Sequence, residues 1–509
     1  MTQSDYSPSL LSLIFARAAL AASAAALLDG CTVGPDFTPP PAPATANYTT
    51  EKTPDLMPAD SAEAAQHIEL GKKIAADWWT LFHSPELNEL IQDAIANNHT
   101  LEAAKATLAE AQEQVTASGG PLYPKIDLGA SAARQKFGPG FAGGLARSIP
   151  PFSAFSIGPT VSYALDLFGG TRRAIEQQKA LADYQGYELD AAYLTLTGNV
   201  VTEALQIASI RAQIDAVQSI LDDDERTLDL VRQQRRAGTV SDVDVLSSES
   251  QLANDRTLLP PLRQQETVAR HALAILVGKA PGDWSPPDFD LAQLTLPAEL
   301  PLGVPSDLVH DRPDIQASEA QLHAASAAIG VATANMYPQI TLSASFALQG
   351  LSPQDIFPAN NEAWSLIGSA AAPIFHGGQL SAEKRAAVDE FQASLARYQQ
   401  TVLSSFGQVA DVLGALTQDR DQLTAQKDAL HTAQSSLKLT RLSYSAGTSN
   451  IVQVLDAQRL DQQAELGYVR AQAQRYLDST QLFLAAGGGT LQTNDGPTPI
   501  AQGTAGPKN

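Results

Sequence analysis

The chain lacks much of what several large protein classes need. Only one of its 509 residues is cysteine, Cys31, so no internal disulfide can form. Its 33 Lys and Arg residues stand against 55 Asp and Glu, a formal net charge of −22. This balance argues against a nucleic-acid partner, because phosphates require clustered basic side chains. Aromatic residues make up only 6%, which suits long helices that pack through small side chains.

Motifs typical of enzymes and metalloproteins are also absent. The eight histidines are scattered without paired spacing, so no metal site is predicted. No glycine-rich phosphate loop, nucleophile elbow or pair of catalytic acids occurs in a suitable context. We therefore predict no catalytic residues, no cofactor and no enzymatic activity.

No stretch beyond the leader reaches the roughly 20 apolar residues that a membrane-spanning helix requires. A membrane crossing would therefore have to use β-strands. In the leader, a short apolar stretch at 18–28 runs into Leu28-Asp29-Gly30-Cys31 and then a proline-rich segment. This order predicts a signal peptide over residues 1–30 and lipid attachment at Cys31.

The leader departs from the usual lipoprotein pattern in two ways. Asp29 stands where a small or apolar residue is usual, and Arg17 is its only basic residue. The alternative is therefore that Cys31 is incidental. Thr32 is not the acidic residue that keeps lipoproteins on the inner membrane, so the outer membrane is favoured.

The chain is built from two similar halves. Ala237-Gly238-Thr239 recurs 209 residues later as Ala446-Gly447-Thr448, and Val-Leu follows both at the same spacing. Apolar residues at intervals of seven precede both breaks, which indicates helices wound against neighbours. The first half has Val200, Ile207, Ile214, Leu221 and Leu228, with Ile210, Val217 and Val231 three residues out of phase; the second has Val402, Val409, Leu416, Leu423, Leu430 and Leu437.

Each half is predicted to contain one long helix, at 171–236 and 378–445, each about 100 Å long at about 1.5 Å per residue. Shorter helices are predicted at about 84–118, 241–278, 306–335 and 449–484. Strands are predicted at about 124–135, 156–168, 338–348 and 363–375. In these strands apolar residues alternate with small or polar ones, as in barrel strands with an apolar outside and a polar lumen. Four strands cannot close a barrel, so several copies must share one.

These elements predict six regions. After the signal peptide come a lipidated linker and equatorial segment (31–83), the first repeat (84–278), an inter-repeat equatorial linker (279–305), the second repeat (306–486) and a disordered tail (487–509).

Three local features are assigned structural roles. Trp78 and Trp79 are interpreted as packing residues of the N-terminal segment. The run Asp222-Asp223-Asp224-Glu225 is most simply a solvated helix face, since its spacing fits no calcium loop. Asp311-Arg312-Pro313-Asp314 fits a helix start with Pro313 in the first turn.

Six segments, in this order and spacing, match a known pattern. They are CTVGPDF at the cysteine, DWWTLFHSPELNELIQDAIANNHTLEAA at 77–104, FGGTRRA at 168–174, DRPDIQASEAQL at 311–322, MYPQITLSAS at 336–345 and SYSAGTSNIVQVLDAQ at 443–458. From Cys31 to about Gly487 the chain resembles the TolC-like outer-membrane factor family, in its OprM and NodT-type lipoprotein branch.

The resemblance implies an α+β membrane protein that assembles as a homotrimer. Four strands per chain would form one shared 12-stranded β-barrel in the bacterial outer membrane, and the long helices would continue it as a tube into the periplasm. The tube would meet a periplasmic adaptor (membrane fusion protein) and an inner-membrane pump, usually of the resistance-nodulation-division type. Drugs, solvents, lipids or metal ions would leave through this passive duct. The alternative is a periplasmic coiled-coil adaptor or structural rod without a pore, but the twinned strand hairpins favour the duct.

The two Ala-Gly-Thr breaks predict tight helical hairpin tips. Gly238 and Gly447 suit the left-handed residue that ends a helix. Thr239 or Ser241, and Thr448 or Ser449, suit the cap of the next helix. The resemblance implies that Gly238, Thr239, Gly447 and Thr448 also dock the adaptor, whereas the plain alternative is that they only form turns.

The resemblance also places a periplasmic gate just beyond the tips. It implies Gln453 and Asp456 after the second tip, Asp244 after the first, and Tyr444 bonding across to the neighbouring hairpin near Asp244. Three copies of Asp456 around a threefold axis would attract cations into the aperture. Asp244 could instead simply favour the N-terminal end of its helix dipole. Ser449 stands where the family has an arginine, which predicts a less firmly closed gate.

Overall fold

The computed structural model describes residues 32–43, 45, 47–49, 66–137, 150–357 and 361–488. The predictions for the signal peptide, for Cys31 and for the tail beyond residue 488 lie outside these residues. The chain divides into two compact units. The first comprises Met1–Pro40, Leu108–Tyr184 and Ser318–Tyr398, and the second comprises Pro41–Thr107, Gln185–Ala317 and Gln399–Asn509.

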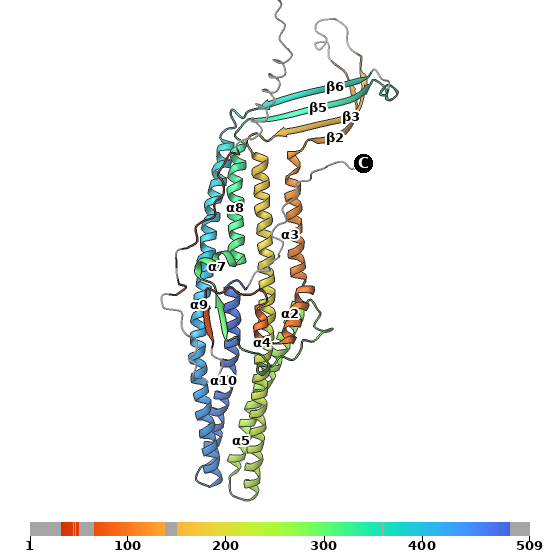
Figure 1. Ribbon diagram of the computed structural model, residues 1–509. Helices are drawn as coiled ribbons and strands as arrows, with labels where there is room; N and C mark the ends of the chain where they lie inside the picture. Colours follow the sequence, from red (N-terminus) through yellow and green to blue (C-terminus); the bar gives the residue numbers. More distant parts are fainter. Residues whose placement is uncertain are drawn as a thin grey trace, which may run out of the picture. The chain divides into compact units, whose positions relative to one another are not determined.

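The first unit contains a four-stranded antiparallel sheet in the order β2-β3-β5-β6 (Figure 1). Its strands are β2 (Lys125–Gln135), β3 (Phe152–Leu165), β5 (Gln339–Gly350) and β6 (Glu362–Ala371). All four were predicted, but two had shifted ends. β3 stops at Leu165 because Asp166 accepts hydrogen bonds from the backbone N–H of Thr171 and Arg172 at the start of the next helix, both at 3.0 Å.

The sheet register gives the sheet one apolar and one polar face. Ile126 lies opposite Val161, Val161 opposite Ala344, and Ala344 opposite Leu366. Because opposite residues in an antiparallel ladder share a face, these side chains form a continuous apolar surface. The other face carries small hydroxyl side chains, with Oγ–Oγ distances of 2.8 Å in Ser131–Ser156 and in Ser345–Ser365. The alternation read from the sequence is confirmed.

The two predicted long helices are confirmed as α4 (Gly170–Arg236) and α9 (Gln379–Ser445), each of 67 residues. α4 begins at the second of two glycines and α9 directly after two glycines, and each helix belongs to both units. In the second unit, α4 forms a hairpin with α5 (Asp242–Asp255), and α9 forms one with α10 (Ile451–Ala485). The two hairpins lie side by side (Figure 1). Their seven-residue apolar tracks provide the core, in which Val200, Ile207 and Val409 are fully buried.

Three helices that the sequence predicted as continuous are each divided in two. They are α2 (Pro85–Asn97) and α3 (His99–Ser118), α5 and α6 (Leu259–Leu276), and α7 (Pro305–Asp311) and α8 (Pro313–Ala334). At the first break, Asn98 caps α3 by accepting from the Leu101 N–H at 3.0 Å. At the second, Pro260 and Pro261 cannot donate to the preceding turn. At the third, Pro313 keeps Arg312 out of the helical conformation and starts α8, as predicted for that motif.

A short parallel pair, β1 (His67–Leu70) with β4 (Glu299–Leu302), lies in the second unit. Its strands are four residues long, too short to show a pattern in the sequence. Nearby in the chain, the 3₁₀ helix Trp78–Phe82 buries both tryptophans, and Trp78 stacks on Phe483 with 5.1 Å between ring centroids. The packing role predicted for Trp78 and Trp79 is confirmed.

Candidate functional site

Both hairpin tips have the same backbone geometry. Gly238 and Gly447 have φ values of 78° and 75°, in the left-handed region. The residue after each glycine donates twice to the same carbonyl: Thr239 to Gln234 O, with N–O and Oγ1–O distances of 3.0 Å, and Thr448 to Ser443 O, at 2.9 and 3.0 Å. The tight turns predicted for both breaks are therefore confirmed.

The residues after each tip form reciprocal capping boxes. Ser241 Oγ accepts from the Asp244 N–H, and Asp244 Oδ2 accepts from the Ser241 N–H at 2.8 Å. At the second tip, Asn450 Oδ1 accepts from the Gln453 N–H at 3.0 Å, and Gln453 Oε1 accepts from the Asn450 N–H at 3.2 Å. The predicted cap at Ser241 is confirmed.

The predicted cap at Thr448 or Ser449 is wrong. Asn450 occupies the cap position, one residue further on, and Ser449 Oγ instead donates to Gln453 Oε1 at 2.6 Å. Two of the predicted gate residues, Asp244 and Gln453, thus have local structural roles within one chain.

Tyr444 joins the two hairpins, and it does so near Asp244, as the resemblance implied. Its hydroxyl donates to Gln234 Oε1 on α4, and not to Asp244. Burial, together with the negative charge of nearby Asp244, raises the pKa of the Tyr444 phenol. The crossing to the other hairpin near Asp244 was expected, whereas Gln234 as hydrogen-bond partner was not.

Asp456 is exposed on α10 within a single chain. It accepts from Arg459, one turn further along the helix, at 3.2 Å. This pairing leaves its carboxylate on the hairpin surface, where a neighbouring copy could approach it.

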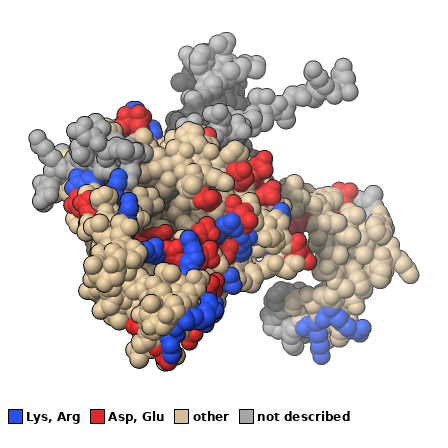
Figure 2. All heavy atoms as spheres, turned by 90° about the horizontal axis from the view of Figure 1, so that it is seen from below, with Lys and Arg blue, Asp and Glu red and all other residues tan. Residues whose placement is uncertain are grey.

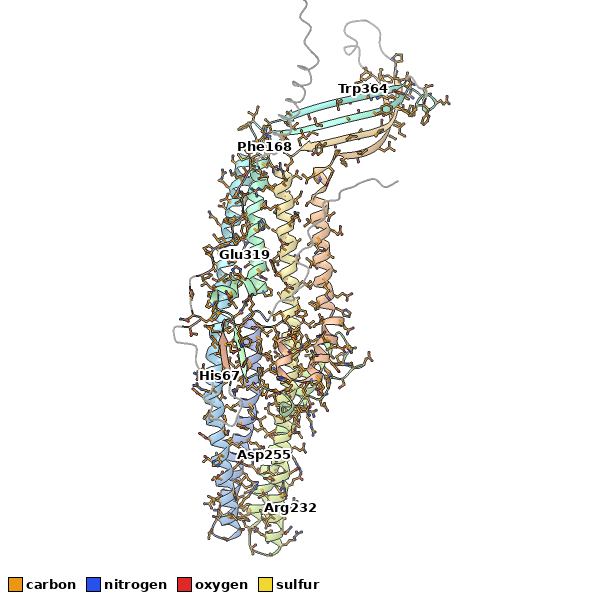
Figure 3. All side chains as sticks on the ribbon, in the orientation of Figure 1. His67, Phe168, Arg232, Asp255, Glu319 and Trp364 are labelled. Carbon is orange, nitrogen blue, oxygen red and sulfur yellow. The ribbon has the colours of Figure 1, made fainter. Side chains whose placement is uncertain are left out.

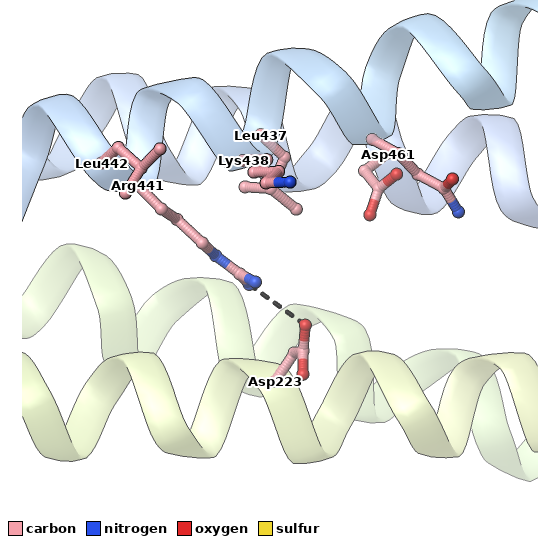
Figure 4. A pocket seen from close by; sticks show the side chains of 7 residues that line it. Asp223, Leu437, Lys438, Arg441, Leu442 and Asp461 are labelled. Carbon is pink, nitrogen blue, oxygen red and sulfur yellow. Dashed lines mark hydrogen bonds and ion pairs between the residues drawn. The ribbon is translucent and has the colours of Figure 1, made fainter.

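An ion pair also joins the hairpins, further from the tips. Arg441 on α9 donates to Asp223 on α4 at 3.1 Å, across a pocket of about 440 Å³ (Figure 4). Lys438 and Asp461 also line this pocket. Arg441 could not be identified from the sequence, because a single arginine on a helix carries no signal of its partner.

An apolar cluster closes the space between the hairpins near the tips. Its members come from α4, α9 and α10, so both hairpins contribute. They are Val231, Leu437, Ile451, Val454 and Ala457. The two hairpins of one chain are thus joined by apolar packing, by the ion pair Arg441–Asp223 and by side-chain hydrogen bonds, among them those of Tyr444 to Gln234 and of Gln458 to Thr227.

Several charged side chains of the hairpins form ion pairs, and acidic and basic groups lie side by side when viewed from below (Figure 2). Arg235 donates to both carboxylate oxygens of Asp242 at 2.6 and 2.8 Å, and Arg232 to Glu249 at 2.8 Å (Figure 3). Such exposed pairs contribute little stability individually.

The interpretation of residues 222–225 as a solvated face is wrong for Asp224. Its side chain is buried, because it lies seven residues after Val217 and seven before Val231 and therefore shares their inward-facing track. The seven-residue spacing could have revealed this from the sequence.

In the first unit, the segment that follows Cys31 is held against α4. The Val33 N–H donates to Phe168 O at 3.1 Å. The buried guanidinium of Arg173 donates to Val33 O at 3.2 Å and to Asp36 at 2.7 Å. Phe37 stacks on His323 with 4.4 Å between ring centroids.

Two features are absent from the described ranges. Among these residues, no helix combines the length and the apolar character needed to cross a membrane. The same residues contain no group of three or more His, Cys, Asp or Glu side chains able to hold a metal ion.

Comparison with known proteins identifies the family. The model of the outer membrane efflux protein family matches residues 90–279 and 304–488, two segments that correspond to the two halves of the chain. The chain belongs to the outer membrane efflux protein family. It is an outer-membrane channel protein of an efflux system, not an enzyme, and its fold is TolC-like.

Relatives and solved structures of this family match over most of their length. The chain is 33% identical over 451 residues to the pyoverdine export outer membrane protein OpmQ of Pseudomonas aeruginosa, covering 86% of this chain and 94% of that protein. It is 30% identical over 471 residues to the toluene efflux pump outer membrane protein TtgC of Pseudomonas putida, covering 91% and 93%. The solved structure of the outer-membrane channel OprN matches with a TM-score of 0.82 and 27% identity, covering 90% of this chain and 99% of that one.

Proposed function

We propose that three copies of this chain form a passive exit duct, with a shared 12-stranded barrel in the outer membrane and a helical tube in the periplasm. The observation that carries this proposal is the four-stranded sheet, in which β2 and β6 each pair on one side only. Unpaired strand edges are not tolerated in hydrocarbon, so further copies must supply their partners.

The two faces of the sheet support the same arrangement. Large apolar side chains such as Leu128 and Leu366, and Trp364 labelled in Figure 3, are exposed in the single chain. They would meet lipid on the outside of the barrel, while the serine-rich face would line the lumen.

The hairpin tips are the proposed contact with the rest of the pump. Gly238, Thr239, Gly447 and Thr448 would dock a periplasmic adaptor, which links the duct to an inner-membrane pump, most simply of the resistance-nodulation-division type. Asp456, Asp244, Tyr444 and Gln453 would form the gate. The inter-hairpin contacts of Tyr444 and Arg441 support this, since widening the aperture requires the hairpins to move.

Lipid attachment at Cys31 would anchor the assembled duct. Arg173 and Phe168 hold the segment that begins at Thr32 against the start of α4, next to the strand β3. The names of two relatives mention pyoverdine export and toluene efflux, which supports small organic molecules as the class of cargo.

The test combines mass and conductance. The protein purified in mild detergent should contain three chains by light scattering, and it should form pores in planar bilayers whose conductance rises in Asp456→Ala. The matched control Asp229→Ala, on an exposed α4 residue, should conduct like the unaltered protein. A single chain in lipid, or bilayers that stay silent with both variants, contradicts the duct.

A further inference from the structure

Two aspartates face each other inside the first hairpin. Asp224 on α4 is 3% exposed and Asp255 on α5 is 8% exposed (Asp255 is labelled in Figure 3). Arg256, next to Asp255, donates to Glu225, next to Asp224, at 2.7 Å, and this register places the two carboxyl groups against each other, where a hydrogen bond between them contributes to the raised pKa of Asp224. Two adjacent carboxylates cannot both remain ionised at such a site, because burial removes the water that would stabilise their charges.

The neighbouring amides distinguish the two aspartates. Asp255 Oδ2 accepts from Gln251 Nε2 at 2.7 Å and from Gln462 Nε2 at 3.1 Å, and both bonds stabilise a carboxylate. Neither oxygen of Asp224 receives a hydrogen bond from any described residue. Asp224 therefore holds the proton and donates it towards Asp255. Burial, followed by the contact with Asp255, raises the pKa of Asp224 to about 8.

The second hairpin contains a similar pair. Asp419 on α9 is 7% exposed, and half-buried Asp478 on α10 is the hydrogen-bond partner that contributes to its raised pKa. Gln474 Nε2 donates to both oxygens of Asp478 at 3.2 Å, whereas Asp419 Oδ2 has no donor among the described residues. Burial and the contact with Asp478 raise the pKa of Asp419 to about 8.

The two aspartate pairs have the same arrangement, but they do not occupy equivalent positions in the two halves of the chain. In both, the long helix supplies the protonated aspartate, and a glutamine four residues before the other aspartate stabilises its charge. A displacement of 209 residues takes Asp224 and Asp255 to Ala433 and Ala464, and Asp419 and Asp478 back to Ile210 and Ala269. Duplication of one ancestral pair therefore does not explain both.

Other charged groups modulate the pairs without neutralising them. Asp223 on α4 raises the pKa of Asp224, and Arg441 on α9 lowers it. On α10, burial raises the pKa of both Asp461 and Glu465. Arg475 on α10 lowers the pKa of Asp419.

We propose that each helical hairpin carries a carboxyl pair that binds one shared proton, and that this proton fastens the two helices of the hairpin together. Loss of the proton leaves two adjacent anions, both of them buried in the first hairpin and one of them buried in the second, which drives the helices apart. Since the folded pKa lies above the ordinary value of 3.8, the stabilisation is complete below pH 3.8 and is lost as the pH rises through about 8. The two helical hairpins are thus most stable at acid pH and become less stable at mildly alkaline pH.

The test uses Asp224→Asn, Asp419→Asn and the double variant. Asparagine keeps the shape and can still donate a hydrogen bond, so the variants mimic the protonated state at every pH. At neutral pH, infrared difference spectra should show the C=O stretch of a protonated carboxylic acid. Each single variant should lose about half of this band and the double variant nearly all of it. Asp229→Asn is the matched control, because Asp229 lies on α4 with its side chain 74% exposed.

Thermal unfolding provides the second readout. The melting temperature of the unaltered protein and of Asp229→Asn should fall between about pH 6 and about pH 9, and that of the double variant should stay nearly level. An unchanged infrared band, or an equal pH slope in the double variant, overturns the proposal. So does stabilisation by Mg²⁺ or Ca²⁺ that the double variant lacks, since the pairs would then bind metal instead of a proton. Both readouts concern groups within one chain, so they stay informative even if the trimeric duct is wrong.

Discussion

At the scale of single residues, the tips depend on glycine because of backbone conformation and not because of crowding. Gly238 and Gly447 both have positive φ, yet a Cβ atom at either position would meet nothing within 4 Å. An alanine there would keep its contacts but lose conformational energy, because L-residues other than glycine disfavour the left-handed region.

We predict that Gly238→Ala and Gly447→Ala each lower the free energy of unfolding by about 1 kcal/mol. Urea unfolding followed by circular dichroism measures this loss. Gly186→Ala is a control that should change stability in the opposite direction. Gly186 lies within α4 with free space around it, so alanine should raise the free energy of unfolding by about 0.5–1 kcal/mol. Equal effects at tip and helix would show that the positive φ is not what requires glycine.

At the scale of elements, α5 and α10 begin in the same way with different residues. The two capping boxes are formed by Ser241 with Asp244 and by Asn450 with Gln453. A carboxylate in the first and an amide oxygen in the second accept the same hydrogen bond from the backbone N–H of the cap residue. The negative charge of Asp244 is therefore not required for the cap, although it also favours the N-terminal end of the helix dipole.

This difference separates the capping role of Asp244 from its proposed gate role. Asp244→Asn keeps an oxygen that can accept from the Ser241 N–H, whereas Asp244→Ala removes it, so only alanine should cost about 1 kcal/mol of stability. If Asp244 also belongs to the gate, both variants should raise the single-channel conductance in planar bilayers. A conductance that changes in neither variant would leave Asp244 as a cap only.

At the scale of the whole molecule, the two faces of the sheet should differ in how well they tolerate a charged side chain. Leu128 lies on the apolar face, opposite Pro159, and Ser131 lies on the other face, where it contacts Ser156. Both positions are on β2, three residues apart, so one strand provides both the test and its control.

We predict that Leu128→Arg prevents assembly, because an arginine facing the middle of the lipid costs about 2–4 kcal/mol in each copy. Ser131→Arg should assemble normally and shift the ion selectivity of the pore towards anions, since three added positive charges would line the lumen. Heat-resistant trimers on gels and reversal potentials in a salt gradient measure the two effects. Normal assembly of Leu128→Arg would mean that the apolar face does not meet lipid.

The sequence by itself determined the two long helices, the four strands of the antiparallel sheet and the organisation into two halves. Periodicity alone identified α4 and α9, since a seven-residue apolar repeat holds over a whole helix without any knowledge of the partner. Alternation identified the four strands, because the side-chain period of two is a local property of the backbone. The tip glycines were equally visible, since a positive φ is a local demand.

Only the tertiary structure decided which polar side chains meet. Gln234 as the partner of Tyr444, Arg441 with Asp223, and Asp224 with Asp255 all join residues from different helices. Such contacts depend on how the helices rotate and slide against one another, and many polar residues on each helix could satisfy the same local pattern. The seven-residue apolar track on α4 determines how this helix is rotated. Asp224 lies on that track between Val217 and Val231, and it is therefore buried.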